Sequence, residues 1–124
     1  MKPSIPFDFL LNDLPAGIIV KPAIGMFYIY FNGRIVLIFR KTNKNPQFNG
    51  IWIATTRDHH HSLKVDVPAV SEFQLEEGID TAWLLLNHEH DDFESAAAKI
   101  CQLVAYKDPR IGKVTPKSAA LFGH

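Results

Sequence analysis

The sequence predicts an α+β domain with a mainly antiparallel sheet of about five strands and flanking helices. The main evidence for the sheet is a pair of aromatic and β-branched runs, 26–31 and 34–40, separated only by Asn32-Gly33. This dipeptide favours a type I′ hairpin turn, in which both central residues need positive φ. The main evidence for a helix is an apolar stripe with spacings of three and four residues in 91–106. Strands in runs, with helices covering one side, are typical of the α+β class.

The other elements follow from weaker patterns of the same kind. A first helix is expected from an apolar stripe of helical period. A second is expected from Thr55 as N-cap with Asp58 three residues later. In chain order we expect a helix at 7–14, strands at 18–20, 26–31 and 34–40, a polar loop at 42–50, a strand at 51–54, a helix at 55–66, strands at 70–75 and 81–86, and a helix at 91–106.

Chain length and composition indicate the number of domains and the cellular compartment. A length of 124 residues indicates one domain, which we expect at 1–108, followed by a basic C-terminal tail at 109–124. The single cysteine, Cys101, cannot form an internal disulfide. No segment approaches the roughly 20 apolar residues that cross a bilayer, and the first residues do not resemble a signal peptide. We therefore expect a cytoplasmic protein that has no membrane partner.

Charge is balanced overall but unevenly distributed. The formal net charge is zero. Basic side chains dominate 34–64, acidic side chains dominate 65–94, and basic side chains dominate again after 95. These blocks either neutralise one another in the folded protein or form opposed patches that steer a charged partner.

Four short segments share features with a known superfamily. They are Pro22-Ala23-Ile24-Gly25-Met26-Phe27 with the aromatic strand and Gly33-Arg34 turn that follow, the strand-to-helix joint at 50–63, Pro68-Ala69-Val70, and Thr81-Ala82-Trp83. Together they resemble the TfoX N-terminal domains and the YjbR (MmcQ) proteins. YjbR proteins usually carry an Asn-Lys pair before the tryptophan, where this chain has Asp80-Thr81-Ala82. The resemblance implies a frataxin-like arrangement of sheet and helices and no established catalytic residues.

We interpret the chain as a non-enzymatic interaction or regulatory domain that needs no cofactor. It has no phosphate-binding glycine loop, no paired cysteines and no local signature of a catalytic triad. The expected partner is a protein or DNA, and the oligomeric state stays open. As an alternative, a basic loop with an aromatic residue could act as a DNA-binding wing. The candidate partner-binding residues are Arg34, Arg40, Lys41, Lys44, Phe48, Arg57 and Lys64.

A second alternative is a metal- or ligand-binding domain. Its candidate ligands are His59, His61, His88 and His90, because imidazole suits zinc or nickel. Consecutive helical residues point about 100° apart, so the three histidines at 59–61 cannot all ligate one ion. One of these three is expected to face the core and the other two to face water.

Overall fold

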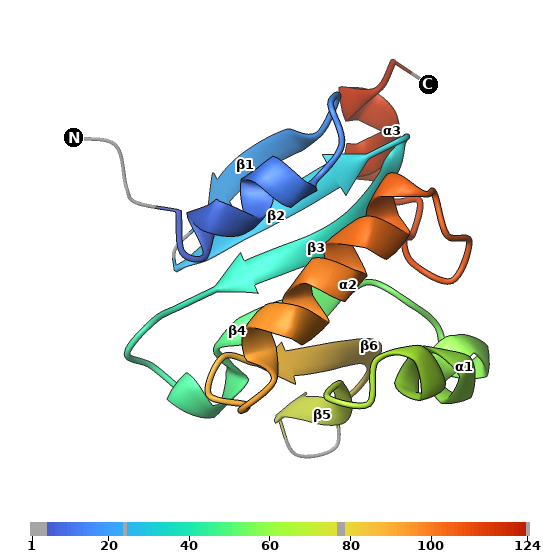
Figure 1. The fold of residues 1–124 in the computed structure, drawn as a ribbon. Helices are drawn as coiled ribbons and strands as arrows, with labels where there is room; N and C mark the ends of the chain where they lie inside the picture. Colours follow the sequence, from blue (N-terminus) through green and yellow to red (C-terminus); the bar gives the residue numbers. More distant parts are fainter. Residues whose placement is uncertain (1–4, 24, 77–78, 124) are drawn as a thin grey trace.

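The computed structural model describes residues 5–23, 25–76 and 79–123, and the strands of these residues form one six-stranded sheet (Figure 1). The strand order is β1-β2-β3-β4-β6-β5, and every neighbouring pair is antiparallel. The predicted α+β class is therefore confirmed. The elements, with short 3₁₀ helices labelled η, are η1 (Asp8–Asp13), β1 (Ile19–Ala23), β2 (Met26–Phe31), β3 (Arg34–Arg40), η2 (Pro46–Phe48), β4 (Gly50–Ile53), η3 (Arg57–His59), α1 (His60–Asp66), β5 (Ser71–Glu76), β6 (Ile79–Asn87), α2 (Phe93–Ala105) and α3 (Pro116–Leu121).

The predicted hairpin is confirmed, and it joins β2 to β3. Asn32 and Gly33 have φ of 55° and 78°, and Phe31 pairs with Arg34 across the turn. The pairing then shifts by one residue, which leaves Val36 as the extra residue of a bulge. Val36 joins the same core cluster as the next residue, Leu37.

Both faces of the sheet are covered by apolar side chains. This explains why apolar and polar residues alternate so little along its strands. On the face covered by α2 and η1 (Figure 1), the side chains of β3 and β4 include Phe39, Ile51 and Ile53, each 2% exposed or less. On the opposite face, Ile38 and Trp52 belong to a second buried cluster. A strand buried on both sides reads as a continuous hydrophobic run.

The C-terminal segment differs from the expected tail. Ile111 is buried, Lys113 forms a β-bridge with Ile35, and α3 follows. Leu121 and Phe122 pack against the second cluster, so α3 lies on the face opposite α2 (Figure 1). The sequence pattern hid this helix because it is only six residues long and lies in a basic stretch.

The stability of α3 depends on a capping box. The Thr115 hydroxyl accepts a hydrogen bond from the Ser118 amide, and the Ser118 hydroxyl accepts one from the Thr115 amide. We expect Thr115→Ala to cost about 1 kcal/mol of the free energy of unfolding, because loss of an N-cap exposes backbone donors. Urea unfolding checks this, with Lys117→Ala, an exposed change in the same helix, as control. Equal stability of the two variants would contradict the role of the cap.

Two other helices begin later than the sequence indicates. The N-terminal helix is a 3₁₀ helix at Asp8–Asp13. Thr55 does not cap the second helix, because its buried hydroxyl donates to the Arg110 carbonyl at 2.7 Å. Thr56 instead precedes η3, and α1 starts only at His60. Within the described residues, no helix is both long and apolar enough to cross a membrane.

Candidate interaction surface

The 42–50 loop is held in place by a buried arginine. Arg40 is the last residue of β3 and is 8% exposed. Its guanidinium donates to the carbonyls of Lys44 at 2.7 Å and Asn45 at 3.0 Å, and to Asn49 Oδ1 at 2.8 Å. Burial lowers the pKa of the Arg40 guanidinium from its ordinary value. These three acceptors replace the water that the buried cation has lost.

Asn49 joins the two ends of the same loop. Its Oδ1 also accepts from the Thr42 amide at 3.1 Å, and its Nδ2 donates to the Thr42 carbonyl at 2.9 Å. Asn45 has φ of 51°, in the left-handed region that asparagine tolerates better than most residues. Arg40 and Asn49 thus fix the loop through five hydrogen bonds. A polar network of this kind pre-organises a loop for binding, because the loop has less conformational entropy to lose.

Phe48 anchors this loop to the sheet. Its ring lies 5.9 Å from the Phe73 ring and 5.9 Å from the Arg40 guanidinium. The Phe48 carbonyl accepts from the Trp52 indole at 2.8 Å. In this position the half-buried Phe48 ring stabilises the loop and does not project as a wing would.

The exposed surface of the loop is polar and basic. Lys41 and Lys44 are both exposed, and the exposed residues between and after them are Asn43, Asn45, Pro46 and Gln47. No acidic residue occurs in 41–48. The last residue of β6 supports it from one side, because Asn87 Nδ2 donates to the Gln47 carbonyl at 3.1 Å. We call residues 41–48 the basic loop.

The candidate partner-binding residues are divided between two ends of the sheet. Arg40 pairs with Gly50 at the end that carries the basic loop. Arg34 begins β3 at the other end, where the Ala54 amide donates to the Val36 carbonyl. Helix α1, which carries Lys64 and directly follows η3 with Arg57, also lies toward that other end (Figure 1). The seven predicted residues therefore do not form one continuous surface, and the Lys64 ammonium lies 3.4 Å from the carboxylate of Glu72.

The four candidate metal ligands are likewise separated. His59 and His61 lie at the start of the α1 region. His88 lies at the end that carries the basic loop, where its amide donates to the Asn49 carbonyl at 3.1 Å. His90 Nδ1 accepts from the Asp92 amide at 3.0 Å. The four cannot form one site, and no group of three potential ligands among the described residues could hold a metal ion.

Arg110, to which no sequence pattern assigns a role, ties the C-terminal segment to α1. Arg110 Nη2 lies 2.7 Å from carboxylate oxygens of both Asp66 and Asp108. Its Nε also donates to Asp108 at 2.9 Å, and its Nη1 donates to Ser62 Oγ at 3.2 Å. These hydrogen bonds from Arg110 lower the pKa of Asp108. Only the neighbouring Asp108 could have been anticipated, because Ser62 and Asp66 are distant in the chain.

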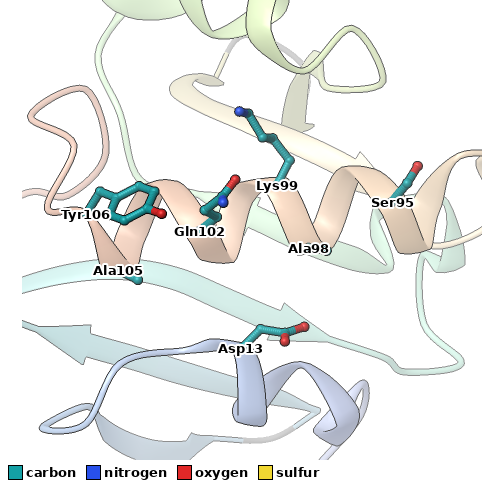
Figure 2. Close-up of a pocket in the computed structure, with 7 residues that line it drawn as sticks. All are labelled: Asp13, Ser95, Ala98, Lys99, Gln102, Ala105 and Tyr106. Atoms are coloured by element: carbon teal, nitrogen blue, oxygen red, sulfur yellow. The ribbon is translucent and has the colours of Figure 1, made fainter.

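An open groove of about 540 Å³ lies between η1 and α2. Figure 2 shows Asp13 on one side of α2 and Lys99 extending from the opposite side. The two charged side chains therefore do not point to one place, and they do not form a binding site for a single charged ligand. The other residues lining the groove are Ser95, Ala98, Gln102, Ala105 and Tyr106.

Comparisons of the chain with protein-family models, with curated proteins and with solved structures find no significant match. The geometry of the described residues is therefore the basis for the functional proposal.

Proposed function

We propose that this protein is a non-enzymatic interaction domain and that it contacts an acidic surface of a protein partner through the basic loop. The observation that carries the proposal is the buried Arg40, whose guanidinium fixes the backbone of the loop from inside. A buried arginine is expensive to desolvate and is stable here only because the loop supplies its acceptors. The positive charge of Arg40 also lies close to the exposed Lys41 and Lys44, so it strengthens the positive potential at the surface of the basic loop.

A protein partner fits this surface better than DNA does. Two exposed lysines and one polar loop make a small basic area. Of the other predicted cations, Arg34 lies at the opposite end of β3 from Arg40, and Arg57 and Lys64 lie on η3 and α1. Proteins that bind duplex DNA usually present a longer basic surface, since affinity comes largely from many phosphate contacts. DNA binding is therefore the competing outcome of the test.

The test uses two anionic probes and charge-reversed variants. Fluorescence anisotropy measures binding of a labelled polyglutamate peptide and of a labelled 20-base-pair duplex at low salt. We expect the wild type to bind polyglutamate more tightly than duplex. Lys41→Glu/Lys44→Glu should weaken polyglutamate binding about tenfold or more, because two attractions become repulsions.

The matched control is Lys99→Glu/Lys117→Glu, which changes the net charge equally on exposed positions away from the basic loop. Its affinity for polyglutamate should fall far less. Equal weakening by both variants would show that only net charge matters. Tighter binding of duplex, with a steep salt dependence, would favour DNA as partner.

Two further parts of the proposal concern family and compartment. We propose that the chain is a TfoX/YjbR-like domain with a frataxin-like arrangement, which the antiparallel sheet and flanking helices support. We also propose a cytoplasmic location. The buried free thiol of Cys101 is compatible with a reducing compartment.

A further inference from the structure

His60 is the histidine of the 59–61 run that faces the core, as expected for one of the three. It is the first residue of α1 and is 5% exposed, whereas His61 is exposed. Both of its ring nitrogens contact oxygens on other elements. Nδ1 lies 3.0 Å from Glu72 Oε1 on β5, and Nε2 contacts the carbonyl oxygen of Ala82 on β6.

These contacts require two protons. A backbone carbonyl can only accept, so Nε2 must donate to Ala82. An ionised carboxylate can likewise only accept hydrogen bonds, so Nδ1 must donate to Glu72 while Glu72 is ionised. A neutral imidazole has a single N–H and can satisfy only one of these oxygens.

Charged side chains surround the ring of His60. The hydrogen bond from His60, followed by the nearby Lys64 ammonium, lowers the pKa of Glu72, so this carboxylate stays ionised into the acid range. Asp58, on η3, is the other acidic group near this ring: the hydrogen bond from the Thr56 hydroxyl is the main cause that lowers the pKa of Asp58, and the charge of His60 is the smallest. Lys64, 3.4 Å from Glu72, carries the opposite charge.

We propose that His60 is a pH-dependent latch that fastens the start of α1 to β5 and β6 only while both of its ring nitrogens carry protons. Loss of one proton at rising pH places a nitrogen lone pair against an oxygen lone pair. The start of α1 then loses one of its two attachments to the sheet. Histidine is the side chain whose charge ordinarily changes between pH 5 and 8, so the test below covers that interval.

The discriminating variant is Glu72→Gln. A glutamine amide can donate to a neutral Nδ1, so this variant satisfies both nitrogens of His60 after the proton is lost. Glu72 is 56% exposed, so the variant should fold. The matched control is Glu89→Gln, which removes an exposed carboxylate 4.0 Å from a different histidine, His88.

Thermal unfolding of the full chain is measured between pH 5.5 and 8.5. We expect the Tm of the wild type and of Glu89→Gln to fall over this interval by about 5 °C more than that of Glu72→Gln. Amide hydrogen exchange in α1 should accelerate with pH in the wild type but much less in Glu72→Gln. Long-range ¹⁵N–¹H spectra of the imidazoles should show two ring protons on His60 at pH 5.5. Parallel Tm profiles for all three proteins, or a neutral His60 at pH 5.5, would overturn the proposal.

Discussion

Arg40→Met should lower the free energy of unfolding by about 3 kcal/mol, because it leaves buried acceptors without their donor. Methionine fills a similar volume, so the loss reflects hydrogen bonding more than packing. The carbonyls of Lys44 and Asn45 lose the guanidinium that now binds them, and Asn49 Oδ1 keeps only its bond from the Thr42 amide. Urea unfolding measures the change.

The control for this prediction is Lys41→Met at the neighbouring residue. Lys41 is exposed, so the same chemical change there should alter stability by only about 0.5 kcal/mol in either direction. Arg40→Lys should fall between the two, since an ammonium keeps the charge but cannot reproduce the forked donors. If Arg40→Met and Lys41→Met are equally stable, Arg40 does not hold the loop.

Arg110→Ala should have an effect of similar size on a different part of the fold. The variant removes a cation that is 18% exposed and leaves Asp108, 15% exposed, with its charge unpaired. We expect a loss of about 3 kcal/mol. Hydrogen exchange should also show that 108–113 and the C-terminal end of α1 become less protected. Lys99→Ala, an exposed change on α2, serves as control. Unchanged protection of both segments would contradict the role of Arg110.

The same variant should change the response to acid. Hydrogen bonds from Arg110 lower the pKa of Asp108 in the folded protein. A carboxyl with a lowered pKa stabilises the fold above its unfolded value, and this contribution is lost as the pH falls through the folded value. The wild type should therefore lose stability below about pH 4, where an unfolded aspartate takes up its proton. Arg110→Ala should lose less over this interval.

Local patterns predicted most of the fold. The Asn32-Gly33 turn and the stripe of α2 depend on neighbouring residues, so a sequence shows them directly. The start of the α1 region was misplaced because Thr55 bonds to the Arg110 carbonyl, a contact that no local pattern reveals. Helix α3 was missed because its few apolar residues are stabilised by packing on the second face of the sheet.

The candidate site was predicted less well, for a physical reason. A sequence shows where cations occur but not which of them are buried. Arg40 and Lys41 are adjacent and look equivalent, yet the first binds backbone carbonyls inside the loop and the second faces water. Arg34 and Arg40 are also the first and last residues of one extended strand, so they lie roughly 20 Å apart and do not share a surface.

The central claim is that Arg40 pre-organises the basic loop before any partner binds. Backbone ¹⁵N relaxation of the free protein tests it most directly at Asn43, Lys44, Asn45 and Gln47. We predict order parameters of about 0.85 at these residues, as in rigid backbone, and a fall below about 0.6 in Arg40→Met. Order parameters below about 0.6 in the wild type would show a flexible loop and would contradict the claim.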